Sequence, residues 1–217
     1  MSNSIPLSFL SKIGICEPIE IHGKMVQVSV VLNSAVLVAK INELKSSLVN
    51  SEKRVVGIDF KFIQPNGSPT GTMLLLCDEK CCLIIPLVHL NCVPKTLKQF
   101  LADETICFLG TGMNDIVRVL LENHDVQCGT GIDVGFLAAN ILKKPNIENY
   151  GLAKLAHEVG EDHIKDPIFG EFPDWNARVF SKEQIKYAMH NAYTSYVLGK
   201  KLLNIDSLLQ GLQCTII

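Results

Sequence analysis

The apolar run Val55–Ile58, which ends in the triplet Asp59-Phe60-Lys61, constrains the fold of this chain most strongly. A short apolar run without polar alternation is typical of a strand that is covered on both faces, so it predicts the interior of a sheet. Side chains alternate along a strand, and Asp59 and Lys61 therefore point to the same face. The chain must fold around a buried strand that brings two opposite charges to one place.

The segments around this strand alternate between strand and helix patterns. Strands are predicted at Met25–Leu32, Arg54–Phe60, Met73–Cys77, Cys81–Leu87, Thr105–Gly110 and Gly131–Val134, and helices from Asn33 or Ser34, at Pro94–Ala102, from Asn114 and at Ser181–Leu203. The first helix places Leu37, Ile41, Leu44 and Leu48 on one face. Asp78-Glu79-Lys80 predicts a hairpin turn and Gln64–Pro69 a loop. Strands mixed with helices in this way predict an α/β fold, a sheet covered by helices.

Two further segments carry polar residues at the ends of predicted elements. Asp115 lies within Gly110–Val117, near the start of a helix that follows a strand. Tyr187 and Asn191 are four residues apart in the last predicted helix, so they are neighbours on one face. That helix begins with a capping pattern, because Ser181 can cap it while Gln184 reaches back.

These three segments, in this order and spacing, resemble the motifs of the DEDD 3′–5′ exonucleases, specifically the Werner-syndrome-like exonucleases of the plant type, whose third motif carries a tyrosine. The resemblance covers roughly residues 22–203. It implies a ribonuclease H-like exonuclease fold, with a mixed central β-sheet flanked by α-helices. The exonuclease-like domain is expected at residues 22–204, between a flexible N-terminal segment (1–21) and a C-terminal tail (205–217).

The resemblance also implies a site, at which this chain departs from the family pattern. The motif positions are Asp59, Lys61, Asp115, Tyr187 and Asn191. The family has Glu where this chain has Lys61 and Asp where it has Asn191. Its members cleave phosphodiester bonds with two divalent cations about 3.5–4 Å apart, held mainly by carboxylates. The family tyrosine orients the attacking water.

The charges at these positions argue against metal binding. Asp59 and Asp115 are negative, Lys61 is positive and Asn191 is neutral, whereas the family pattern supplies four carboxylates. If the site is active, Mg²⁺ or Mn²⁺ is the expected cofactor; given Lys61, no bound metal is expected, and Asp59 and Asp115 would be weak ligands at most. We expect the Lys61 ammonium to replace the cation and to pair with Asp59, Asp115 or both. The alternative is that Lys61 extends into solvent.

The predicted function is a 3′–5′ exonuclease-family protein with a degenerate two-metal site, a nucleic-acid-binding or scaffolding pseudo-nuclease with weak or no cleavage. It would hold the 3′ end of DNA or RNA, or bind a protein partner such as an active paralogue. One alternative is an active metal-dependent 3′–5′ exonuclease on DNA or RNA. A third hypothesis is a purely structural interaction without nucleic acid.

Composition limits the remaining possibilities. A length of 217 residues fits one main domain, and a net charge of −2 gives no general attraction to nucleic acid. The chain has eight cysteines but neither zinc-site spacing nor a secretory signal, so we expect reduced thiols and an intracellular protein, nuclear or cytoplasmic. No transmembrane segment is predicted. The terminal Cys214-Thr215-Ile216-Ile217 fits a prenylation signal if Thr is allowed in second place, but no basic cluster precedes it, so we expect an apolar tail instead.

Overall fold

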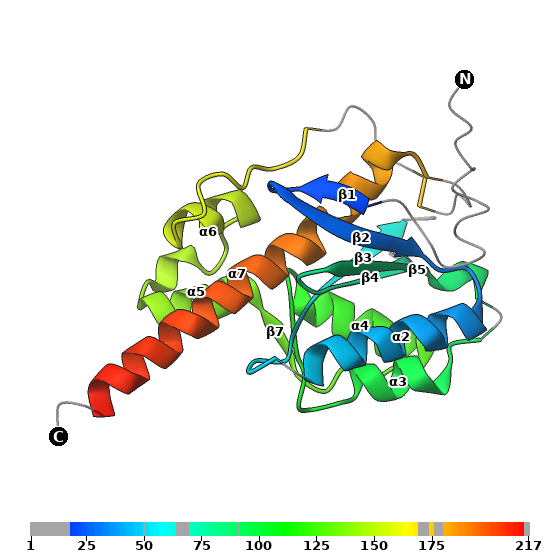
Figure 1. The fold of residues 1–217 in the computed structure, drawn as a ribbon, viewed down its shortest axis with the longest axis horizontal. Coiled ribbons are helices and arrows are strands. Elements are labelled where there is room, and N and C mark those ends of the chain that lie inside the picture. Colours follow the sequence, from blue (N-terminus) through cyan, green and yellow to red (C-terminus); the bar gives the residue numbers. More distant parts are fainter. Residues whose placement is uncertain are drawn as a thin grey trace.

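A seven-stranded mixed sheet forms the centre of the molecule, and helices cover both of its faces (Figure 1). The computed structural model describes residues 18–49, 51–63, 70–90, 92–168, 174–175 and 180–214. The strands are β1 (Pro18–Ile21), β2 (Lys24–Val30), β3 (Val55–Ile63), β4 (Thr70–Cys77), β5 (Cys81–Pro86), β6 (Cys107–Gly110) and β7 (Gly131–Asp133). The helices are α2 (Ser34–Val49), α3 (Lys95–Leu101), α4 (Met113–His124), α5 (Val134–Leu142), α6 (Leu152–Glu158) and α7 (Lys182–Cys214), with short 3₁₀ turns η2 (Leu87–His89) and η3 (Pro145–Ile147).

The strand order β1-β2-β5-β4-β3-β6-β7 places β3 inside the sheet, as its apolar sequence predicts. β3 pairs antiparallel with β4 and parallel with β6, which in turn pairs parallel with β7. The carboxyl ends of β3, β6 and β7 therefore meet at one edge of the sheet. Asp59 is the middle residue of β3, and Gly110 at the end of β6 packs against its neighbour Ile58.

One face of the sheet is covered by α2, α3 and α4. The buried residues of α2 are Leu37, Ile41, Leu44 and Leu48, the four that the sequence predicts. They share a core cluster with alternate residues of β3, namely Val56, Ile58 and Phe60. Asn33 caps α2, because its side-chain oxygen accepts hydrogen bonds from the backbone N–H groups of Ala35 (2.8 Å) and Val36 (3.3 Å).

The long helix α7 crosses the opposite face (Figure 1). It approaches β3 so closely that a Cβ atom on Gly57 would overlap the backbone oxygen of Ala192. Glycine is required here by the closeness of the two backbones. The predicted start of α7 is confirmed, since Ser181 N–H donates to Gln184 Oε1 (2.8 Å) and Gln184 N–H donates to Ser181 Oγ (3.2 Å). α5 and α6 pack against the middle of α7 in a third cluster.

Regular structure extends beyond the predicted elements at both ends of the described domain. Residues 18–21, which were expected within a flexible segment, form β1 and pair antiparallel with β2. Ile19 and Ile21 are buried there, and an alternation over four residues is too short to be recognised in sequence. α7 continues to Cys214 instead of ending at Leu203, because no helix-breaking proline follows. Residues 64–69, the predicted loop, lie outside the described residues.

The expectation that every cysteine is reduced is also wrong in the structure. Cys77 and Cys82, which face each other across the β4–β5 hairpin, form a disulfide. A directly opposed cross-strand pair brings the two sulfur atoms within bonding reach, a relationship that depends on strand register. Among the described residues, no helix is long and apolar enough to span a membrane.

Candidate functional site

The predicted site residues come from β3, from the start of α4 and from the first half of α7. Asp59 and Lys61 follow Gly57 at intervals of two on β3, so they share the face that α7 covers. On α7, Tyr187 and Asn191 precede the Ala192 contact by five residues and one residue. The structure therefore brings the first and third motifs onto the same side of the sheet.

Asp59 and Lys61 form a buried ion pair. Lys61 Nζ lies 2.6 Å from Asp59 Oδ2, and the two side chains are 11% and 8% exposed. The contact is one of charge and not an aligned hydrogen bond, since Asp59 Oδ2 has no hydrogen-bond donor of good geometry among the described residues. The expected pairing of Lys61 with Asp59 is confirmed, and the alternative, a Lys61 side chain extended into solvent, is wrong.

Two aromatic rings complete the surroundings of the Lys61 ammonium. Nζ lies 5.8 Å from the ring centroids of both Trp175 and Tyr187. These rings stack on each other with centroids 6.1 Å apart and an interplanar angle of 6°. A cation near aromatic rings gains about 0.5–1 kcal/mol at each ring, and more when it is desolvated. Tyr187 thus contacts the ammonium group of Lys61, and Trp175 joins the site although no motif in the sequence indicated it.

Asp115 is not part of this ion pair and forms a separate one. Its side chain is 70% exposed, and its Oδ1 accepts from Arg118 at 2.9 Å, one helical turn along α4. Arg118 also reaches Glu122, at 3.3 Å. The spacing of three residues between Asp115 and Arg118 was the available signal for this pair. Asn191 is half-buried on α7.

Asp115 borders a cleft of about 660 Å³ at the carboxyl ends of β6 and β7. Asp133, which is not among the predicted site residues, shapes this cleft: its Oδ2 accepts from Gly112 N–H (2.8 Å) and its Oδ1 from Gly135 N–H (2.9 Å). Asp133 therefore caps α5 and ties the β6–α4 turn to β7. An Asp between a short strand and a helix was the sequence signal for it.

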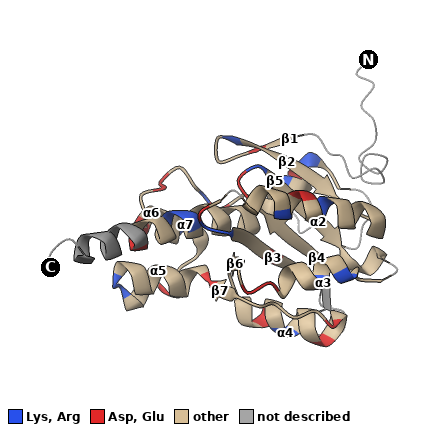
Figure 2. Ribbon diagram, turned by 60° about the horizontal axis from the view of Figure 1, so that its bottom comes forward, with Lys and Arg blue, Asp and Glu red and all other residues tan. Residues whose placement is uncertain are grey.

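The charges around the site are mixed and do not form a basic surface. Figure 2 shows lysine or arginine and aspartate or glutamate scattered over the helices and loops. Several lysines that could have contacted phosphate are paired: Lys98 with Asp125, Lys144 with Glu158, Lys200 with Glu79 and Lys201 with Glu161. Nucleic acid would have to bind in a local groove.

The fold and the motif geometry agree with a comparison of the whole sequence with protein families. A family model described as 3′-5′ exonuclease matches residues 31–205. The chain belongs to the 3′–5′ exonuclease family. This result confirms the resemblance drawn from the three motifs and the α/β fold predicted with it.

Individual relatives are distant and longer. The human exonuclease 3'-5' domain-containing protein 2 is 26% identical over 155 residues, which are 69% of this chain and 25% of the relative. This chain thus spans about a quarter of that protein. The crystal structure of the EXD2 exonuclease domain soaked in Mg and GMP has a TM-score of 0.50 at 24% identity, covering 87% of this chain and 95% of that one. RNase D of Escherichia coli has a TM-score of 0.65 at 16% identity, covering 83% and 45%. Both likenesses support the fold.

Proposed function

We propose that this 3′–5′ exonuclease-family protein is a nucleic-acid-binding or scaffolding pseudo-nuclease in which the Lys61 ammonium replaces a catalytic cation. The observation that carries the proposal is the contact of 2.6 Å between Lys61 Nζ and Asp59 Oδ2 in a buried setting. An ammonium group there neutralises the carboxylate that a metal ion would need as a ligand, and it repels any divalent ion nearby.

The donor set supports the same proposal. Two-metal cleavage depends on carboxylates that hold both ions and offset their charge. Here Asp59 is bound to Lys61, Asp115 to Arg118, and position 191 is an amide. Within the described ranges, no three His, Cys, Asp or Glu side chains are grouped to hold a metal ion. The residues present do not fit the two-metal site of the family, although a related structure was soaked in Mg and GMP.

What remains suits binding better than cleavage. The cleft of about 660 Å³ beside Asp115 offers space for a ligand without any bound metal. The proposal includes a DNA or RNA 3′ end as ligand, an active paralogue as a possible protein partner, and an intracellular location, nuclear or cytoplasmic.

A reversion experiment tests the proposal. The natural chain and the double variant Lys61→Glu plus Asn191→Asp are incubated with 3′-labelled single-stranded and recessed DNA and RNA, with Mg²⁺ or Mn²⁺. We expect cleavage only by the revertant, which regains all four carboxylates. Metal affinity is measured in parallel by calorimetry, and it should rise in the revertant.

A matched charge reversal at an exposed lysine, Lys95→Glu on α3, is the control, and it should alter neither cleavage nor metal affinity. Metal-dependent cleavage by the natural chain at the revertant's rate would show that it is an active exonuclease. Failure of the natural chain to bind any of these substrates would remove nucleic acid from the proposal.

A further inference from the structure

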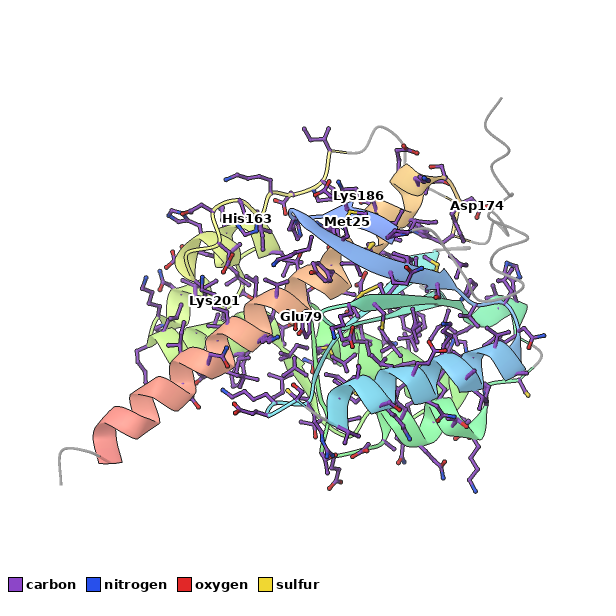
Figure 3. The ribbon with its side chains drawn as sticks, viewed as in Figure 1. Met25, Glu79, His163, Asp174, Lys186 and Lys201 are labelled. Carbon is purple, nitrogen blue, oxygen red and sulfur yellow. A yellow bond between two sulfur atoms is a disulfide. The ribbon has the colours of Figure 1, made fainter. Side chains whose placement is uncertain are left out.

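A second pocket, of about 420 Å³, lies beside the first turns of α7 and contains none of the motif residues. It is enclosed by the β1–β2 turn, the segment that follows α6, and α7. In Figure 3 the β1–β2 turn lies between His163 on that segment and Lys186 on α7. Its polar lining consists of Glu20, His22, His163, Lys165, Lys186 and His190.

His190 is the member of this lining that most needs a ligand. Its side chain is only 4% exposed, and its Nε2 atom is buried without a hydrogen-bond partner within the described part of the chain. A buried polar atom left in that state costs about 1–3 kcal/mol. A ligand in the pocket would supply the missing hydrogen bond.

Three histidines gather here from segments far apart in the sequence. The ring of His22 lies 5.2 Å from that of His190 and 6.3 Å from that of His163, measured between centroids. His22 is held in place by a hydrogen bond of 2.8 Å between its Nε2 and Thr194 Oγ1. His163 Nδ1 lies 3.4 Å from Glu161 Oε2. The His163 side chain is exposed, so its ring is able to rotate towards the pocket.

Two lysines and one carboxylate line the pocket together with the histidines. The pKa of His190 is lowered to about 4, mainly by burial; the charges of His22 and Lys61 act in the same direction and Asp166 opposes them. Burial likewise lowers the pKa of His22 to about 4, with His163 and Lys186 adding to the effect and Glu20 opposing it. Glu20 is already engaged, because it binds Lys186 (3.2 Å) and accepts from Gly23 N–H (2.9 Å).

The choice between a metal ion and an anion follows from these neighbours. Lys165 and Lys186 line the pocket and would repel a cation. The described residues also contain no trio of donor side chains placed to hold a metal. Imidazole N–H and ammonium groups are hydrogen-bond donors, and several of them converging on one cavity suit an oxyanion.

We propose that this pocket binds a phosphate group, with His190 Nε2–H, His163 and Lys165 as donors to its oxygens, while Lys186 stays paired with Glu20. No motif residue lines the pocket, although His190 is the neighbour of Asn191 on α7, and the proposal does not depend on whether the chain cleaves nucleic acid. The phosphate could belong to a free phosphate or phosphomonoester, or to the diester backbone of a nucleic-acid strand.

The test uses the full chain and follows the imidazole signals of its histidines by NMR. Inorganic phosphate is the first probe, and two short oligonucleotides of one sequence, with and without a terminal phosphate, are the second and third. We expect saturable shifts of the His22, His163 and His190 signals at millimolar phosphate, which corresponds to about −4 kcal/mol. Binding of only the phosphorylated oligonucleotide would identify a monoester, and equal binding of both would identify the diester backbone.

The variant His163→Gln plus Lys165→Ala changes two exposed side chains and should preserve the fold. We expect it to weaken phosphate binding about tenfold or more, a loss of ~1.4 kcal/mol. His157→Gln plus Lys95→Ala, an exposed histidine and lysine outside the pocket, should leave binding unchanged. Histidine signals that stay fixed in millimolar phosphate, undiminished binding by the first variant, or saturable zinc binding without phosphate binding would each overturn the proposal.

Discussion

Replacing Lys61 by methionine should destabilise the protein strongly, because it leaves Asp59 buried without its charge partner. Two unit charges 2.6 Å apart attract by about 6 kcal/mol at an effective dielectric constant of about 20. The measured loss has a lower ceiling. The protein and water relax around the unpaired carboxylate, so breaking a buried pair typically costs about 3–5 kcal/mol. We therefore expect Lys61→Met to lose about 3 kcal/mol at pH 7, in the range for a broken buried pair.

The assay is urea unfolding of four proteins: the natural chain, Lys61→Met, Asp59→Asn and the double variant. The double variant should lose only about 1 kcal/mol, because no charge remains buried, so the coupling energy should be at least about 2 kcal/mol. Lys95→Met, an exposed control on α3, should change stability by less than about 0.5 kcal/mol. A Lys61→Met variant as stable as this control would refute the buried ion pair.

Three other predictions use the same unfolding measurement. Gly57→Ala should destabilise the fold by more than about 3 kcal/mol or prevent folding, because the new methyl group meets the rigid backbone of Ala192. Gly199→Ala should destabilise it less, because its methyl group meets only the side chain of Leu109. Equal losses of stability would contradict the close approach of α7 to β3. Asn33→Ala should cost about 1 kcal/mol through loss of the α2 cap, whereas Ser34→Ala should cost almost nothing, and the reverse order would show that Ser34 is the cap. Stability should fall as the pH drops from 6.5 to about 4, because the pKa of His22 and of His190 is lowered to about 4 in the folded chain, so the unfolded chain binds more protons in that window. For His190 alone the loss amounts to ~3 kcal/mol, at ~1.4 kcal/mol per pH unit. A His190→Gln variant whose stability falls with pH as steeply as that of the natural chain would contradict this prediction.

The sequence predicts those features that depend on local periodicity or on neighbouring residues. The four buried positions of α2, the Asp78–Lys80 turn and the cap formed by Ser181 and Gln184 all follow from patterns within a few residues. The ion pair between Asp59 and Lys61 is predictable for the same reason, since side chains two residues apart on a strand point to the same face of the sheet.

Features that depend on tertiary contacts could not be predicted. The rings of Trp175 and Tyr187 meet Lys61 only because α7 lies across β3. The disulfide between Cys77 and Cys82 depends on strand register, and the short β1 strand is stabilised by its pairing with β2. His22 and His190 are separated by most of the chain, and no spacing rule relates them.

The position of α7 across the sheet also has a consequence for how the chain acquires its structure. The core cluster beneath α7 joins residues of β1 and β2 near one end of the sequence to residues of α7 near the other. Contacts between such distant segments slow folding, because a long loop must close before they form. During synthesis one apolar face of the sheet stays uncovered until α7 has left the ribosome, and chaperones can bind this face until then. A chain truncated before α7 should bind a hydrophobic dye and aggregate, even though every strand of the sheet is present.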